Sequence, residues 1–305
     1  MHELPELAWS AAEAVGARLA GVSPLLLAAG LALHALKLAA RARAWQNVLR
    51  AALPEASVRL RDAAVPYLAG IAAGAVVPFG GGELMRVALA RARLRGSTAT
   101  ILGSLTVERA LDVAVSALVV SIALTVGMVP KSELRGRLAG LVGFSAQPIA
   151  WGVAGGSLGL TAAAVFRYRR RLAAVRTSVL CGLRVLGQPK RYVVSVASWQ
   201  LLAWGLRFGA LVLLLESFHV RSAILVAPIV LSLQLLAGSV PLTPAGAGTQ
   251  QALVAAAFGG GAIVAFSAGA QLATALVDVL LGSAVLVACG MRPRLRPLRA
   301  ALAAA

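Results

Sequence analysis

Charged side chains are scarce in this sequence. Of its 305 residues only 13% are Asp, Glu, Lys or Arg, about half the share found in an ordinary soluble domain. Apolar residues make up 59% of the chain, and the mean hydropathy is +0.84. Because so few charges cannot cover the surface of a water-soluble globule, the composition predicts an integral membrane protein.

Acidic residues, aromatic residues and cysteines are also few. The 29 Lys and Arg residues outnumber the 11 Asp and Glu residues, which gives a formal net charge of +18. Nucleic-acid binding would need this excess on a soluble scaffold with aromatic side chains or a known module, but aromatics are only 5% of the chain. Cys181 and Cys289 are too few for a disulfide framework and lack the spacing of metal ligands. We therefore expect no nucleic-acid partner.

Apolar stretches near the length of a bilayer crossing predict the membrane-spanning helices. They cover residues 22–40, 98–126, 142–166, 193–215 and 263–290. Two further apolar stretches, 64–80 and 223–240, run into segments rich in Pro and Gly at 78–83 and 241–248. Such residues break helices, and at membrane depth they mark discontinuous segments.

The basic residues indicate how these two stretches run. They gather in the connections 41–61, 86–95, 131–137, 167–191 and 292–299, and Lys and Arg prefer the cytoplasmic side. If 64–95 and 223–260 are re-entrant hairpins, every cluster except 131–137 lies on one side, with 21 of the 29 basic residues. The pattern thus predicts an external N-terminus, a cytoplasmic C-terminus and a basic rim at the anionic cytoplasmic leaflet.

An internal repeat appears when the chain is shifted against itself by 166 residues. Pro and Gly positions of the two broken segments then coincide, and Asp112 coincides with Asp278. The predicted fold is an all-α polytopic membrane protein with two inverted-topology repeats, each a span, a re-entrant hairpin and a span. The alternative is chance recurrence of Pro and Gly in a chain with 31 Gly residues.

We predict a single integral membrane domain over residues 1–305. Its parts are repeat one at about 22–126, a connecting span at 142–166, a cytoplasmic basic segment at 167–192 and repeat two at about 193–290.

A few charged residues lie inside the apolar stretches. They are Glu83, Glu108, Arg109, Asp112 and Asp278. A charge at the bilayer centre costs about 3 kcal/mol or more, so it normally faces a partner or water. Glu108 and Asp112 are one turn apart and share a helix face. Two interpretations stay open: the acids line a polar pocket where the hairpin tips meet, with Arg86 at its mouth beside Glu83, or they pair with arginines and lock the bundle.

The glycine-rich tips at 80–82 and 245–248 favour an anionic ligand. Each precedes a half-helix whose N-terminal end carries free backbone amides and partial positive charge, which suits a phosphate head group. Neither tip continues into Gly-Lys-Ser/Thr or has dinucleotide-binding spacing. We expect no nucleotide, metal or other cofactor and no catalytic activity. His34 and His219 stand isolated in the sequence and are interpreted as structural.

Four motifs in order resemble a known family. They are Arg43-Ala44-Trp45, the tip 78–83 with Arg86, the run 108–112 and the segment 241–248. Over about residues 25–290 the chain is similar to the membrane region of lysylphosphatidylglycerol synthases, also called flippase-like domain proteins. This resemblance implies a bacterial or archaeal inner-membrane protein that moves a lipid between leaflets. We expect no aminoacyltransferase domain here, so synthase activity is not implied.

The leading hypothesis is a lipid transporter or flippase. Its substrate would be an anionic or amphiphilic phospholipid or lipid-linked head group. The candidate substrate-binding residues are Gly80, Gly81, Gly82, Glu83, Arg86, Glu108, Arg109, Asp112, Thr243, Gly246, Gly248, Gln250 and Asp278. The family pattern commonly has Glu where this chain has Gln250-Gln251, so a coupling acid is not implied there. The alternative is a non-transporting membrane subunit that serves a separate glycosyltransferase or lipid synthase.

Overall fold

The computed structural model describes residues 21–77, 81–94, 96–125, 183–187, 189–238, 248–258 and 262–290, and within these ranges it contains helices and no strands. The α-helices are α2 (Pro24–Ala52), α3 (Leu60–Val76), α4 (Gly81–Leu94), α5 (Thr98–Thr125), α9 (Pro189–Tyr192), α10 (Ser198–Ser217), α11 (Ala223–Gly238), α12 (Thr249–Phe258) and α13 (Ala262–Ala288). A 3-10 turn, η1 (Arg184–Gly187), precedes α9, and a π-helical turn, η2 (Val193–Ala197), joins α9 to α10. The predicted all-α fold is confirmed.

Three helical stretches are long and apolar enough to cross a bilayer: Pro24–Ala52, Pro189–Ser217 and Ile263–Ala288. In the most apolar part of the third stretch only 11% of the residues are buried inside the protein. Leu272 and Leu276, for example, are 72% and 60% exposed. Because a continuous apolar surface of this kind is stable against lipid and rare against water, the chain is a membrane protein.

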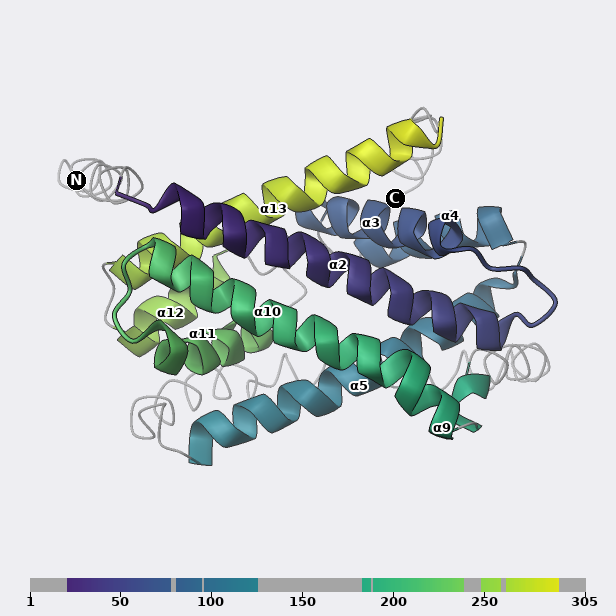
Figure 1. Ribbon diagram of the computed structural model, residues 1–305, viewed down its shortest axis with the longest axis horizontal. Helices are drawn as coiled ribbons and strands as arrows, with labels where there is room; N and C mark the ends of the chain where they lie inside the picture. Colours follow the sequence, from purple (N-terminus) through teal and green to yellow (C-terminus); the bar gives the residue numbers. More distant parts are fainter. Residues whose placement is uncertain are drawn as a thin grey trace, which may run out of the picture.

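Helices α2 and α10 form the antiparallel central pair of the molecule (Figure 1). At one end the backbone N–H of Ser23 donates to the carbonyl of Ser217 at 2.9 Å. At the other end Asn47 Nδ2 donates to the carbonyl of Ser195 at 2.5 Å. Helix α2 continues to Ala52, well past the predicted end of the first span at residue 40, because its second half is buried in the protein.

Two short helices, α3 and α4, pack closely beside the central pair (Figure 1). Gly70 of α3 and Gly82 of α4 permit these two helices to approach each other closely, since a Cβ atom on Gly82 would lie 2.5 Å from the carbonyl oxygen of Gly70. Helices α11 and α12 contact each other toward the opposite end of the molecule. The two pairs follow the predicted hairpin segments, with α3 beginning four residues earlier than expected.

The remaining long helices connect the two parts of the chain. Helix α13 packs on α3, and helix α5 packs on α11 as well as on α2. The contact between α13 and α3 is close, because a Cβ atom on Gly282 would lie 2.4 Å from Ala72 Cβ. Helices from the first and second halves of the sequence are therefore interleaved.

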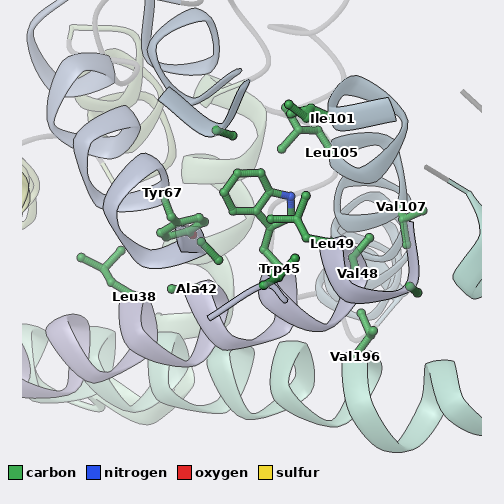
Figure 2. Close-up of a cluster of buried hydrophobic side chains, with 14 residues drawn as sticks. Leu38, Ala42, Trp45, Val48, Leu49, Tyr67, Ile101, Leu105, Val107 and Val196 are labelled. Carbon is green, nitrogen blue, oxygen red and sulfur yellow. The ribbon is translucent and has the colours of Figure 1, made fainter. Parts of the chain in front are cut away.

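The apolar interior consists of two clusters. The first surrounds Trp45, which is fully buried among side chains of α2, α3, α5 and η2 (Figure 2). The second surrounds Phe266 of α13 and includes residues of α10, α11 and α12. There the ring of Phe218 meets Phe266 edge-on, with ring centroids 5.5 Å apart. Between the two clusters, charged side chains of α2, α5, α10 and α13 come together.

Several predictions fall outside the described residues. They concern the connecting span 142–166, the basic residues 167–182, Gly80 at the first tip, and Thr243 and Gly246 at the second. The predicted division of the chain into repeats and connecting segments thus stays a prediction.

The close contact at Gly282 predicts a size limit there. In Gly282→Ala the new methyl group would also lie 2.7 Å from the carbonyl oxygen of Leu68, so we expect a loss of about 1–3 kcal/mol from overpacking. Thermal unfolding in a neutral detergent measures it. Gly205→Ala is the control, since nothing lies within 4 Å of a Cβ at Gly205. Equal melting temperatures for the two variants would contradict the described packing of α13 on α3.

Candidate functional site

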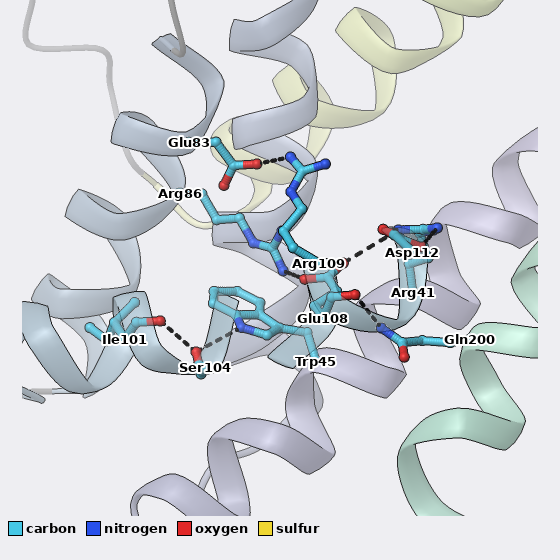
Figure 3. Close-up of polar contacts among 10 residues, drawn as sticks. All are labelled: Arg41, Trp45, Glu83, Arg86, Ile101, Ser104, Glu108, Arg109, Asp112 and Gln200. Atoms are coloured by element: carbon cyan, nitrogen blue, oxygen red, sulfur yellow. Dashed lines mark hydrogen bonds and ion pairs between the residues drawn. The ribbon is translucent and has the colours of Figure 1, made fainter. Parts of the chain in front are cut away.

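Helix α5 supplies two carboxylates to the interior. Glu108 and Asp112 lie one turn apart, and Glu108 is only 3% exposed. The guanidinium of Arg86, from α4, donates to Glu108, and that of Arg41, from α2, forks onto both oxygens of Asp112 (Figure 3). The distance from Arg41 Nη1 to Asp112 Oδ2 is 2.6 Å. Paired, doubly hydrogen-bonded charges of this kind are tolerated in a low-dielectric interior.

Arg86 lies between two aromatic rings. Its guanidinium carbon is 4.0 Å from the ring centroid of Trp45 and 4.5 Å from that of Tyr67. The indole N–H of Trp45 points away and donates to Ser104 at 3.1 Å. A desolvated guanidinium gains from such faces and from one carboxylate together. Arg86 thereby holds α2, α3, α4 and α5 around a single charge, and only 6% of it is exposed.

Helix α10 contacts the same two residues from the other side, Asp112 at its carboxylate and Glu108 at its backbone. Trp204 Nε1 donates to Asp112 Oδ1 at 3.1 Å, and Gln200 Nε2 donates to the backbone carbonyl of Glu108 at 3.3 Å. Arg41 also lies 3.6 Å from Glu108 Oε1. The acids of α5 are thus shared between a helix of the first half of the chain and a helix of the second.

A second polar group centres on Asp278 of α13. His34 Nε2 lies 2.9 Å from Asp278 Oδ1, and Lys37 Nζ lies 3.2 Å from His34 Nδ1. His34, Lys37 and Arg41 recur at three- and four-residue intervals on α2, so they share one face of the helix. This face brings the Asp278 group and the Asp112 group into a continuous line.

Arg207 of α10 completes the line. Its Nη2 lies 3.5 Å from Gln234 Oε1 of α11, and its guanidinium carbon is 5.3 Å from the ring centroid of Trp204. Across the ranges that the structure describes, Lys37 and Arg207 have no carboxylate within 4 Å. Both side chains are half-buried.

The third pair, Glu83 with Arg109, lies at the surface (Figure 3). The two side chains are 40% and 63% exposed, so water and salt weaken their attraction. The expected neighbouring arrangement of Arg86 with Glu83 is wrong. Arg86 turns inward because Glu108 and two aromatic rings stabilise its charge better than a partly exposed carboxylate can.

Where the tips are described, their glycines serve packing and capping. Gly82 lies against Gly70, and a Cβ on Gly81 would lie 2.4 Å from a methyl group of Val77. Gly248 has a left-handed φ of 84°, and its N–H donates to Gln251 Oε1 at 2.7 Å. Gln250 is buried, and its Nε2 donates to Ser267 Oγ at 3.0 Å. The amide of Gly248 is therefore already used within the protein.

Sequence reasoning missed part of this network. His34 stood isolated in the sequence because its partner, Asp278, lies 244 residues away. Lys37 carried no motif, and Arg207 was marked only by its coincidence with Arg41 under the shift of 166 residues. The signal available was the recurrence of three ionisable side chains, His34, Lys37 and Arg41, on one face of a membrane-spanning helix, which is expensive unless those groups meet partners or a ligand.

The fold and the site together define a class: a polytopic α-helical membrane protein with charged groups buried between its helices. In the described part of the chain, no group of three His, Cys, Asp or Glu residues could hold a metal ion.

The family follows from comparison with known proteins. The profile of the lysylphosphatidylglycerol synthase TM region matches residues 7–290, so the chain belongs to that family. No curated protein and no solved structure gave a significant match.

The pairing of Arg86 with Glu108 generates a stability prediction. Glu108→Gln leaves the buried guanidinium without its carboxylate, which we expect to cost about 3–5 kcal/mol. The matched control, Glu83→Gln, removes the same charge from the exposed pair and should change stability by less than about 1 kcal/mol. Thermal unfolding in neutral detergent compares the two. A loss in Glu83→Gln as large as that in Glu108→Gln would contradict the assignment of the buried pair.

Proposed function

We propose that this chain translocates an anionic or amphiphilic phospholipid, or a lipid-linked head group, between the leaflets of the cell membrane. No chemical step is part of the proposal. Membership of the family supports a role connected with membrane lipids. The observation that carries the proposal is the line of charged side chains along α2 and α10, because charges are kept inside a membrane protein where polar groups must pass or bind.

The helix boundaries support two repeats. Adding 166 to the bounds of α2 gives 190–218. The continuous helical stretch made of α9, η2 and α10 covers 189–217. Adding 166 to those of α5 gives 264–291, against Ala262–Ala288 for α13. The short helices α3 and α4 likewise correspond to α11 and α12, within a few residues. Because α2 and α10 are antiparallel (Figure 1), the two repeats would have inverted orientation.

The packing follows the same correspondence. Helix α3 contacts α13, and its counterpart α11 contacts α5, which is the counterpart of α13. Each repeat thus places its last helix on the hairpin of the other repeat. Inverted repeats that enclose a central site are the usual construction of secondary transporters.

An arginine and an aspartate at equivalent positions in the two halves are bonded differently. Arg41 and Asp112 correspond to Arg207 and Asp278 under the same shift. Arg41 holds Asp112 in a fork, whereas Asp278 is bonded to His34, and the hydrogen bond of Arg207 to a described residue goes to Gln234. We infer that the protein has a second conformation in which the two halves exchange their bonding. In that conformation Arg207 would pair with Asp278, and Arg41 would release Asp112. Such an exchange would open the site toward each leaflet in turn.

Helix lengths and ends support re-entrant hairpins and the predicted sidedness. Helix α4 has 14 residues and α12 has 10, about 21 and 15 Å at 1.5 Å per residue, short of a bilayer core of about 30 Å. The C-terminal ends of α2 and α13 and the N-terminal ends of α5 and α9 lie toward the same end of the molecule (Figure 1). The proposal assigns this end to the cytoplasm.

A transport assay tests the proposed function. Purified protein in liposomes with a fluorescent phosphatidylglycerol should speed its exchange between leaflets, measured by quenching of the outer-leaflet probe. Asp278→Asn should slow exchange at least about tenfold, the scale of a lost polar contact worth about 1.4 kcal/mol. Glu216→Gln, at the exposed end of α10, is the control. Wild-type protein no faster than empty liposomes would overturn transport and favour the alternative of a non-transporting subunit for a separate lipid synthase or glycosyltransferase.

Cysteine labelling tests the sidedness. In a chain carrying Cys181→Ala and Cys289→Ala, single cysteines would replace Arg91, Lys190 and Arg221, which are all exposed. With an impermeant thiol reagent on intact cells we expect labelling in Arg221→Cys only. Labelling of all three after membrane disruption is the control for reactivity. Labelling of Arg91→Cys in intact cells, with Lys190→Cys protected, would show that the first hairpin crosses the membrane.

A further inference from the structure

We propose that Lys37 and Arg207 together bind the phosphodiester group of a singly charged anionic lipid. The inference rests on the proposed function and names the part of the substrate that the site would hold. The candidate substrate-binding residues chosen from the sequence include neither side chain.

The charge balance of the network is the first observation. Counted at their formal charges, its cations are Lys37, Arg41, Arg86 and Arg207, and its carboxylates are Glu108, Asp112 and Asp278. Arg41 and Arg86 are neutralised by the two acids of α5. Lys37 Nζ can only donate, so His34 Nδ1 accepts its hydrogen bond and the neutral His34 ring donates from Nε2 to Asp278. The four cations then exceed the three carboxylates by one. An uncompensated charge inside a membrane protein is costly, so a single negative charge brought by a ligand would complete the network.

The free hydrogen-bond donors are the second observation. A guanidinium has five N–H donors and an ammonium has three. With the residues that the structure describes, Arg207 makes one hydrogen bond, at the long distance of 3.5 Å, and Lys37 makes one, at 3.2 Å. Among the described residues, the buried side-chain nitrogens without a partner are Arg86 Nε and Arg93 Nε. The unused nitrogens of Arg207 are not among them, and the Arg207 side chain is partly exposed.

The position of the two residues is the third observation. Lys37 lies on α2 and Arg207 on α10, the antiparallel central pair, and Lys37 is within electrostatic range of Arg207, Asp278 and Arg41. The two cations come from different halves of the chain. A ligand between them would contact both halves at once, which is what a substrate that moves with an exchange of ion pairs requires.

The ligand class follows from the chemistry of these donors. A guanidinium offers a planar fork to two phosphate oxygens, and an ammonium adds a point charge. A phosphodiester has a single negative charge, which matches the excess of one, whereas a phosphomonoester carries about −1.5 to −2 near neutral pH. The geometry therefore favours a phosphodiester head group over a terminal phosphate.

Thermal stability in a neutral detergent tests the site without requiring transport. Soluble dihexanoyl phosphatidylglycerol should raise the melting temperature of the wild-type chain by about 5 °C at saturation. Lys37→Gln/Arg207→Gln should abolish this shift. Without ligand the double variant exchanges an excess of one positive charge for an excess of one negative charge, so it should lose much less stability than Glu108→Gln, which breaks a direct buried ion pair. Lys190→Gln/Arg221→Gln, which removes two exposed charges, should keep the full shift.

Additional ligands and variants in the same assay identify the ligand and distinguish a binding role of the two residues from a structural one. Inorganic phosphate is tested beside the lipid: an equal shift assigns the site to the free anion, and a shift with the lipid alone assigns it to the head group. Arg207→Lys should retain part of the response because it keeps the charge. Three results would overturn the site: no shift in the wild type, an equal shift in the double variant, or a double variant as unstable as Glu108→Gln.

The binding assay and the transport assay test the site and the proposed function independently. An anion-dependent shift in a chain that does not exchange lipid would overturn the proposed function and leave the site standing. Lipid exchange that persists at wild-type rate in Lys37→Gln/Arg207→Gln would overturn the site and leave transport standing.

Discussion

The structure depends on how charged side chains are kept inside an apolar bundle. A charge in the bilayer interior costs about 3 kcal/mol or more, and this chain holds several between its helices. Arg86 shows how the cost is offset: it is bonded to Glu108 and enclosed by the rings of Trp45 and Tyr67. Because these partners come from α2, α3 and α5, α4 must pack in one position for the charge to be satisfied.

The same constraint explains why the network joins both halves of the chain. Asp112 receives Arg41 from the first half and the indole of Trp204 from the second. Asp278 lies on α13 and meets His34 on α2. Satisfied pairs such as Arg86 with Glu108 rigidify the bundle, whereas Lys37 and Arg207 keep unused donors toward the described part of the chain. The proposed substrate site therefore lies where the network is incomplete, and the complete pairs form its frame.

Periodicity and composition predicted much of the fold. Long apolar stretches predicted the membrane helices within a few residues at α5 and α13, and the Pro- and Gly-rich tips separated the short helices correctly. Helix α2 was predicted too short because its second half has the polar residues Arg43, Gln46 and Asn47. Those side chains find partners inside the protein, on neighbouring turns and on η2, which hydropathy does not register.

The site was predictable only in part. Scarce acids in apolar helices identified Glu108, Asp112 and Asp278, but not the partners that reach them from distant helices. The spacing of Glu83 and Arg86 suggested neighbours, whereas packing sends one outward and the other inward. An experimental structure with a bound phospholipid tests the central claim most directly. The head-group phosphate should lie within hydrogen-bond distance of Lys37 Nζ and the Arg207 guanidinium; a head group elsewhere, with both side chains paired to carboxylates of the chain, would contradict it.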